Sequence, residues 1–196
     1  MNAAVQPPLQ AVLDREAIRE CLYRYCRGID RLDEEALRSA YWPDATDSHG
    51  EYRGSATRFV ERALDKLQNA GRMVHMIGNV LIELRGDVAA AESYFLAFQE
   101  GVAGDDRSAE ETLLCGRYVD RFERRGDEWR IASRTVVYDW QRRAPLPARL
   151  SAGAFGARQP TGGRRPNDPI YELLGALEAQ GATGGLHAIA ASRSCT

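Results

Sequence analysis

Residues 72–100 read RMVHMIGNVLIELRGDVAAAESYFLAFQE, and this stretch carries the strongest structural signal in the chain. Two long runs rich in apolar, β-branched and aromatic residues flank Arg85-Gly86-Asp87, which is typical of a β-hairpin with a tight glycine turn. Arg125-Gly126-Asp127 repeats this pattern later in the chain. The sequence therefore predicts a meander of long antiparallel strands, at about residues 72–84, 88–100, 112–124 and 129–140.

Helical patterns precede these strands. Apolar residues recur at the spacing of one buried helix face between Ile18 and Ile29, which predicts a first helix that breaks around residues 30–32. Two further helices are predicted, from the N-cap Asp33 through Tyr41 and over about residues 55–69. Three N-terminal helices followed by a meander indicate an α+β fold. Strands this long in a small domain must curl, so we expect a cone-shaped α+β barrel with a pocket between the helices and the curved antiparallel sheet.

The pattern changes after residue 142. Residues 12–142 have the periodicity of one domain, whereas Pro, Gly, Ala and Arg dominate from residue 143 onward. We expect residues 143–196 to form an irregular extension with one short helix at about 168–178, with Asp168 as its N-cap and Pro169 as its first residue. The extension is expected to be either a lid over the pocket or an arm on a neighbouring subunit.

Composition and motifs exclude several classes of protein. The net charge of −2 gives no electrostatic reason to expect a nucleic-acid or membrane partner, and no apolar stretch reaches membrane-spanning length. The opening residues MNAAVQPPLQAV lack the basic region and apolar run of a signal peptide, so a cytoplasmic protein is expected. We expect neither a cofactor nor a metal, because the sequence has no GxGxxG, P-loop, GxSxG or HExxH pattern and no zinc-type cysteine spacing.

His75 is the strongest candidate for a chemical role among the three histidines of the chain. Strand alternation places four residues on one face of the strand: His75, Ile77, Asn79 and Leu81. A His and an Asn that interrupt an apolar face are typical of a pocket wall. The alternative is a core histidine that bonds a backbone carbonyl.

Asp30 is the carboxylate that we expect to hold this imidazole. Asp33 already suits the cap of the second helix, which leaves Asp30 without a structural role unless it is a solvated carboxylate. An imidazole held by a carboxylate is a general base that works near neutral pH without metal or cofactor. Whether the two residues meet depends on the fold.

Longer phrases of the sequence resemble a known family. The order helix, helix, short strand, helix, long meander is similar to that of the nuclear transport factor 2 (NTF2-like) superfamily. The phrases that resemble its SnoaL-like branch are YRYCRGIDRLDEEALRSAYWPDATDSHGEYRG (23–54), VHMIGNVLIEL (74–84), ESYFLAF (92–98) and GRYVDRFERRGDEWRIASRTVVYDW (116–140). That branch includes scytalone dehydratase, bile-acid 7α-dehydratase, lindane dehydrochlorinase and lyases of lignin-derived diaryl compounds.

The resemblance implies a homotrimer and a cofactor-independent Asp–His dyad, whose positions fall on Asp30 and His75. It implies a lyase that acts on a small hydrophobic substrate, an oxygenated aromatic or polycyclic compound. Elimination of water is the expected reaction, and loss of formaldehyde would use the same base. An isomerase or cyclase with the same dyad is one alternative. The other is a non-catalytic binding or assembly subunit, as in ring-hydroxylating dioxygenases, although such a subunit needs no paired Asp and His.

The resemblance also suggests further site residues. Tyr25 stands where dehydratases of the branch have a tyrosine, which implies a donor to a leaving oxygen or an oxyanion; the alternative is a half-buried helix tyrosine. Arg134 resembles a pocket arginine of the branch and is expected to be catalytic, with an ion pair on the sheet as the alternative. His49 stands where scytalone dehydratase has a pocket tyrosine. The residues expected to bind substrate are His49, Trp42, Asn79 and Tyr138.

Overall fold

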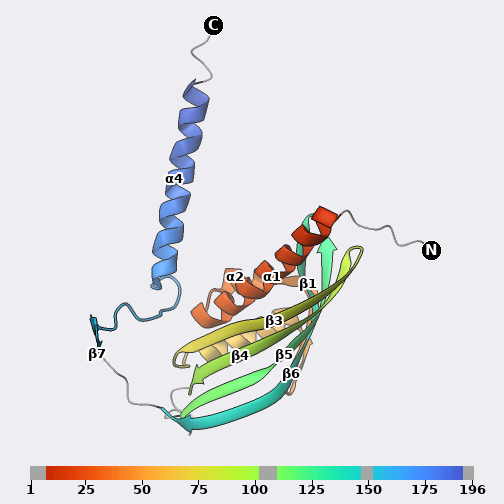
Figure 1. Cartoon of the computed structure of the whole chain (residues 1–196), viewed down its shortest axis with the longest axis vertical. Coiled ribbons are helices and arrows are strands. Elements are labelled where there is room, and N and C mark those ends of the chain that lie inside the picture. Colours follow the sequence, from red (N-terminus) through yellow and green to blue (C-terminus); the bar gives the residue numbers. More distant parts are fainter. Residues whose placement is uncertain (1–7, 102–109, 147–151, 192–196) are drawn as a thin grey trace, which may run out of the picture. The chain divides into compact units, whose positions relative to one another are not determined.

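The computed structural model describes residues 8–101, 110–146 and 152–191 (Figure 1). The chain divides into two compact units, Met1–Ala148 and Arg149–Thr196. The described elements of the first unit are, in chain order, α1 (Pro8–Arg31), α2 (Glu34–Ser39), β1 (Tyr41–His49), β2 (Tyr52–Ser55), α3 (Ala56–Leu67), β3 (Met73–Arg85), β4 (Val88–Glu100), β5 (Glu110–Arg125) and β6 (Glu128–Pro145).

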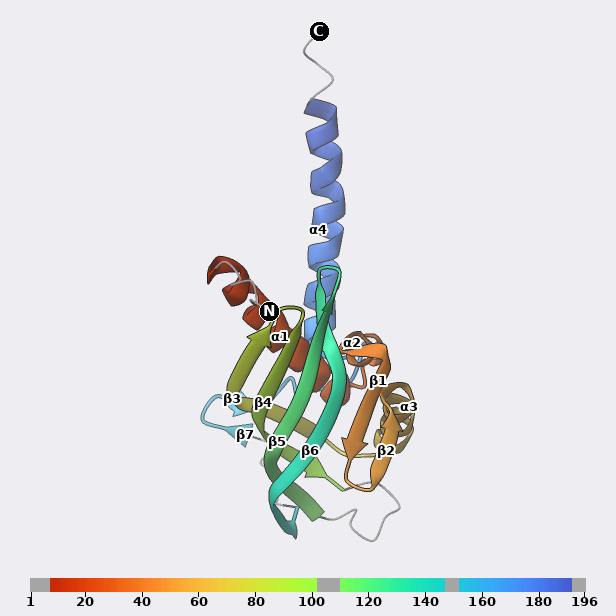
Figure 2. The same ribbon diagram turned by 90° about the vertical axis from the view of Figure 1, so that its right-hand side faces the viewer.

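The strands of the first unit form one curved sheet in the order β2-β1-β6-β5-β4-β3 (Figure 2). β3 to β6 form the predicted antiparallel meander. Gly86 and Gly126, in two of its turns, have φ of 62° and 65°, a left-handed conformation that glycine adopts without strain. The sheet is not wholly antiparallel, because β1 runs parallel to β6. The predicted α+β fold with a curved sheet is confirmed, with this one parallel pair as a difference.

The helices pack on the concave face of the sheet (Figure 1). The predicted inner face of α1 is buried, from Ile18 with 0% exposure to Ile29 with 5%. These side chains join inward-facing residues of the meander in one hydrophobic core, which includes Phe95, Tyr118, Phe122 and Ile131. Burial of this apolar surface is the main force that holds the helices against the sheet.

A tight reversal joins α1 to α2 and fixes the last turn of α1. Leu32 has φ of 50°, and the Asp33 N–H donates to the Gly28 carbonyl at 3.0 Å, as in a Schellman motif. Asp33 caps α2 as predicted, because its carboxylate accepts from the Ala36 N–H at 3.1 Å. A Cβ on Gly28 would lie 2.6 Å from the Leu37 Cβ, so the glycine lets the two helices approach closely.

The second helix is shorter than predicted. It ends at Ser39, and Tyr41 begins β1 instead of continuing the helix. Tyr41 pairs with Ile131 of β6, and the register of this pairing shifts before Thr46, in the segment that contains Pro43. The partner strand lies far along the chain, so the local pattern of charges and apolar residues gave no sign of it.

β3 contains a β-bulge that reverses its alternation. Residues 78–79 lie opposite the single residue Tyr94 of β4. Beyond the bulge, Leu81 is 64% exposed and Ile82 is 7% exposed, which is the reverse of the predicted arrangement. The prediction that Asn79 and Leu81 share the inner face with His75 is therefore wrong, because one inserted residue moves every later side chain to the other face.

The outer face of the meander is apolar and exposed. Its side chains include five that are between 38% and 55% exposed: Val74, Met76, Leu96, Phe98 and Trp140. They are continuous across strands, since Val74 pairs with Phe98 and Met76 with Leu96. Monomeric proteins rarely expose a large apolar patch. The homotrimer stays a prediction, which the mass of the protein in solution would test, and this face is the surface that such an assembly would cover.

The second unit contains β7 (Ala152–Gly153), β8 (Gly156–Ala157) and α4 (Pro169–Ala191). Asp168 caps α4 as predicted, because its carboxylate accepts from the Ile170 N–H at 3.2 Å. The helix is longer than the predicted span of 168–178, since the glycines within residues 181–185 lower helix propensity without forbidding a helix. None of the helices in the described ranges is long and apolar enough to cross a membrane.

Candidate active site

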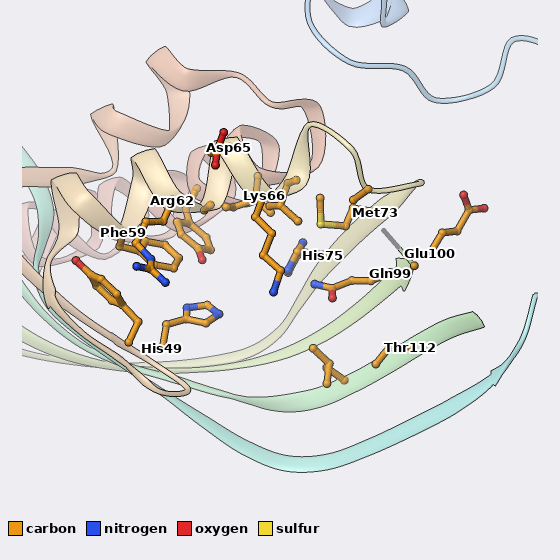
Figure 3. Close-up of a pocket in the computed structure, with 18 of the residues that line it drawn as sticks. His49, Phe59, Arg62, Asp65, Lys66, Met73, His75, Gln99, Glu100 and Thr112 are labelled. Atoms are coloured by element: carbon orange, nitrogen blue, oxygen red, sulfur yellow. The ribbon is translucent and has the colours of Figure 1, made fainter. Parts of the chain in front are cut away.

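A cavity of about 720 Å³ is lined by residues of α1, α3 and the sheet (Figure 3). This volume is in the range of small-molecule sites. Apolar and aromatic side chains form much of its wall, among them Phe59, Met73, Leu114 and Tyr138. The cavity therefore suits a ligand with a hydrophobic body.

His75 and Asp30 form a direct pair at the wall of this cavity. The His75 Nδ1 lies 2.6 Å from the Asp30 Oδ1, and the His75 backbone N–H donates to the Asp30 Oδ2 at 2.9 Å. The side chains of His75 and Asp30 are 7% and 10% exposed. Because an ionised carboxylate can only accept hydrogen bonds, Nδ1 carries the ring proton and Nε2 keeps a free lone pair.

The fold holds this imidazole in one orientation. Asp30 lies in the last turn of α1, which the reversal into α2 fixes, and its carboxylate ties that turn to the backbone of β3. His75 lines the cavity, whereas Asp30 is not among the lining residues. The carboxylate therefore lies behind the ring, and the opposite ring edge, with Nε2, is the one available to a ligand.

Tyr25 also lines the cavity, and it is 1% exposed. Burial raises the pKa of its phenol, so the hydroxyl is protonated at neutral pH and can donate a hydrogen bond. Its ring is packed edge-on against the Tyr41 and Tyr118 rings, with centroids 6.0 and 5.5 Å away. This packing leaves the side chain little freedom to move.

Arg134 does not line the cavity. Its Nε and Nη2 donate to the Asp120 carboxylate at 2.8 and 2.6 Å, and both side chains have 0% exposure. Its guanidinium carbon lies 4.2 Å from the Tyr25 ring centroid and 4.0 Å from that of Tyr118. The ion-pair alternative is therefore what the structure shows. The Nη1 of Arg134 has no hydrogen-bond partner within the described residues, and a catalytic role for this arginine stays a prediction.

His49 is a second histidine of the cavity wall. Its ring stacks on Phe59 with centroids 4.8 Å apart, and its Nδ1 lies 3.7 Å from the Asp47 Oδ1, which is too far for a hydrogen bond. Neither atom has a hydrogen-bond partner within the described residues. Burial, followed by the charge of Arg134, lowers the pKa of His49 to about 4, so this imidazole is neutral at pH 7.

Asp47 is fully buried on β1. Its Oδ2 accepts from the Tyr41 hydroxyl at 2.7 Å. Burial raises the pKa of Asp47 to about 6, against the opposing effects of the Tyr41 hydrogen bond and the Arg134 charge. No hydrogen bond joins His49 to Asp47, in contrast to His75 and Asp30, and burial favours the neutral forms of both His49 and Asp47.

The polar side chains at the site bond mainly to one another. Both oxygens of Asp30 are taken by His75, and one oxygen of Asp47 is taken by Tyr41. Across residues 8–101, 110–146 and 152–191, no group of three or more His, Cys, Asp or Glu side chains is placed to hold a metal ion. The arrangement is one that can move a proton.

A family model described as the SnoaL-like domain matches residues 10–135, more than half of the chain. The chain belongs to the SnoaL-like domain family. No protein of curated function matches the sequence.

Solved structures share the fold of this SnoaL-like domain. Hexachlorocyclohexane dehydrochlorinase LinA-type3 from Novosphingobium barchaimii is 21% identical with a TM-score of 0.61, over 75% of this chain and 99% of that one. A candidate scytalone dehydratase from Novosphingobium aromaticivorans is 15% identical with a TM-score of 0.60, over 80% and 96%. The β subunit of a candidate aromatic-ring-hydroxylating dioxygenase from the same species is 24% identical with a TM-score of 0.52, over 66% and 92%. These matches confirm the NTF2-like cone fold.

The SnoaL-like domain gathers only some of the predicted site residues. Around the cavity lie Tyr25, His49, His75 and Tyr138, with Asp30 behind His75. Trp42 lies elsewhere, at a separate cavity of about 280 Å³, and its Nε1 donates to a backbone carbonyl at 3.0 Å. Asn79 is exposed on the bulge of β3. Neither Trp42 nor Asn79 lines the cavity that contains His75, and their binding of substrate stays a prediction. The third histidine of the chain, His187, has its side chain outside the described residues.

Sequence reasoning missed two basic residues of the cavity, Arg62 and Lys66 on α3. Their signal was present in the helix period, because they follow the inward-facing Phe59 by three and seven residues and so share its side of the helix. They were overlooked because charged residues on a helix are usually solvated. Only the three-dimensional structure shows that this side of α3 faces a cavity.

Proposed function

We propose that this protein is a cofactor-independent lyase in which His75 is the general base and Asp30 orients it. One observation carries the proposal: both oxygens of the Asp30 carboxylate hold His75, which leaves its Nε2 for the cavity. Dehydrochlorinase and dehydratase folds of the same kind support it, but a dioxygenase β subunit shares that fold too. The dyad therefore carries the functional argument, and the fold does not.

The proton that the base removes is bonded to a substrate carbon next to a carbonyl or aryl group. The Nε2 of His75 takes this proton, and the electrons of the C–H bond form a double bond as the group on the adjacent carbon leaves. The Asp30 carboxylate stabilises the imidazolium that results. General base catalysis of this kind contributes about 10²- to 10⁴-fold, and the remaining acceleration comes from orientation and from donors aimed at developing charge.

Tyr25 is the donor best placed to stabilise the charge that develops on the substrate. Its phenol is protonated at neutral pH, and it lines the cavity together with His75. It would donate to the leaving hydroxyl, which departs as water, or to an enolate oxygen. Neutral His49 would contribute hydrogen bonding to the substrate without placing a charge in the cavity.

The substrate class follows from the wall of the cavity. Aromatic and apolar side chains favour an oxygenated aromatic or polycyclic compound. Elimination of water is the proposed reaction, and loss of formaldehyde by retro-aldol cleavage needs the same base. An isomerisation would differ in that the imidazolium returns its proton to another carbon.

Two substitutions in the dyad test the proposal. Purified protein is incubated with hydroxylated aromatic ketones and hydroxylated polycyclic ketones, and loss of water or release of formaldehyde is followed by mass spectrometry. His75→Ala is expected to lower kcat by about 10²- to 10⁴-fold, because the base is gone. Asp44→Ala is the control, because Asp44 forms an exposed ion pair with Arg125 and does not line the cavity, and it is expected to retain kcat.

Asp30→Asn tests the orienting role separately. The His75 backbone N–H needs an oxygen acceptor, so the single amide oxygen of Asn would turn toward it and the NH2 group would face Nδ1. That NH2 donates to Nδ1 and forces the ring proton onto Nε2, which removes the lone pair from the cavity. We expect a loss of kcat close to that of His75→Ala. Turnover that survived either dyad substitution would contradict the mechanism.

A further inference from the structure

Two basic side chains on α3 line the cavity: Arg62 and Lys66. They are four residues apart, so they project from one side of the helix in adjacent turns. Figure 3 shows Lys66 reaching from α3 into the cavity. Lys66 is also the only lysine in the sequence, in which every other long basic side chain is arginine.

These two charges have no carboxylate partner among the described residues. Arg62 lies with its guanidinium carbon 5.6 Å from the Tyr52 ring centroid, a contact that holds the charge at the cavity without neutralising it. Several other arginines of the domain are paired with carboxylates, for example Arg117 with Glu92 at 2.6 Å. Arg62 and Lys66 are therefore available to a ligand.

Three acidic residues also line the cavity. The carboxylates of two of them, Asp65 and Glu100, point away from it in Figure 3. Asp65 accepts from the Gln68 amide at 3.0 Å, and Glu100 accepts from the Arg72 N–H at 2.9 Å. The third, Glu51, lies in the turn between β1 and β2. The charge that α3 itself presents to the cavity is thus positive.

We propose that Arg62 and Lys66 form a binding site for a carboxylate, so that the preferred substrate is an aromatic or polycyclic acid. As a statement about substrate, this inference rests on the proposed function. A guanidinium offers a planar fork of donors and an ammonium offers a compact charge, so one carboxylate can accept from both. A hydrophobic body would then lie against the aromatic wall, with its acidic end held at α3.

Direct binding tests the site without any turnover. The probes are 2-naphthoate and its neutral counterpart 2-naphthamide, and isothermal titration calorimetry of the full chain measures both affinities. We expect the carboxylate to bind about tenfold more tightly than the amide at low ionic strength. Because the charges are exposed, this preference should shrink as sodium chloride is added. Arg62→Gln and Lys66→Met should each weaken the preference, and the double variant should abolish it while leaving amide binding nearly unchanged.

Arg58→Gln is the matched control. Arg58 is exposed on α3 one turn before Arg62, and it is not among the lining residues, so this change removes the same charge without touching the site. It is expected to keep the full preference for the carboxylate. Equal affinity of the wild-type protein for the two probes would overturn the proposal. So would a preference that persists in the double variant, or one that Arg58→Gln abolishes.

His75→Ala separates this inference from the proposed function. His75 is not part of the carboxylate site, so the variant should keep the preference for 2-naphthoate even though turnover is lost. A protein whose dyad proved inactive could thus still contain the carboxylate site. Conversely, a working lyase that bound both probes equally would contradict the carboxylate site alone.

Discussion

Two histidines line the cavity, and each lies near a carboxylate, yet the two pairs are built differently. His75 and Asp30 come from a strand and a helix far apart in the sequence, and their side chains touch at 2.6 Å. His49 and Asp47 are next-but-one neighbours on β1, and the His49 Nδ1 lies 3.7 Å from the Asp47 Oδ1. The long-range pair is the bonded one.

Strand geometry explains the difference. Side chains two residues apart on a strand point to the same face but start about 6.6 Å from each other, which is wide for a short Asp to reach a ring. A helix terminus packed against a strand has no such constraint, so the Asp30 carboxylate can approach both the ring and the backbone of His75. Closeness in sequence is thus a poor guide to a catalytic pair.

A further buried carboxylate, that of Asp120, is expected to have the largest effect on stability. Asp120 is fully bonded, like Asp30, but its partner Arg134 is buried without access to the cavity. Asp120→Ala would leave the Arg134 guanidinium buried without its counter-charge, which we expect to cost about 3–5 kcal/mol of unfolding free energy in urea denaturation.

Asp44→Ala provides the control for this change. Asp44 pairs with Arg125 at 2.7 Å on the exposed surface, where such pairs contribute little. A loss at Asp120 no larger than that at Asp44 would show that the buried pair does not support the core.

The pair of His49 and Asp47 should reveal itself in the pH dependence of stability. The pKa of Asp47 is raised from 3.8 to about 6, so between these values the folded protein keeps a proton that the unfolded chain has lost. The pKa of His49 is lowered from 6.5 to about 4, so there the folded protein lacks a proton that the unfolded chain holds. The two effects oppose each other, and their sum in the wild-type protein is close to zero between pH 4 and 6.

Substitution of one member of this pair leaves the effect of the other on the pH dependence of stability unopposed. In His49→Gln, the effect of Asp47 remains, so relative to the wild-type protein stability should fall as pH rises from 4 to 6, with a difference in slope of up to about 1.4 kcal/mol per pH unit. In Asp47→Asn, the effect of His49 remains, so stability should rise over the same range. Urea unfolding at several pH values measures both slopes. Changes in slope of the same sign in the two variants, each relative to the wild-type protein, would mean that the pair is not buried as described.

Much of the fold was predictable because its signals are local. The glycine turns at Gly86 and Gly126, the cap at Asp33 and the apolar face of α1 each depend on residues within a few positions of one another. Tyr41 was assigned to a helix because its pairing with β6 depends on a distant strand. Asn79 was assigned to the wrong face because alternation cannot reveal an inserted residue.

The site was predictable to a smaller extent. Because Asp33 suits the cap of the second helix, Asp30 has no other structural role in the sequence, and a family resemblance suggests His75 as its partner. The two hydrogen bonds that the Asp30 carboxylate accepts from the ring and the backbone N–H of His75 are known only from the three-dimensional structure. Arg134 was recognised as an inward-facing arginine, yet its bond to Asp120 depends on the register between β5 and β6. The sequence does not show that the side of α3 that carries Lys66 faces a cavity, because residues from distant parts of the chain form that cavity.

The mechanism requires the ring proton of His75 on Nδ1 and a free lone pair on Nε2, so the tautomer of this histidine decides whether it can be the base. Long-range ¹H–¹⁵N correlation spectra of uniformly ¹⁵N-labelled protein at neutral pH distinguish the two neutral tautomers of each histidine. We predict the Nδ1–H tautomer for His75 in the wild-type protein and the Nε2–H tautomer in Asp30→Asn, with the His49 signals unchanged between the two. A wild-type His75 that carries its proton on Nε2, or one that Asp30→Asn leaves unaltered, would contradict the account.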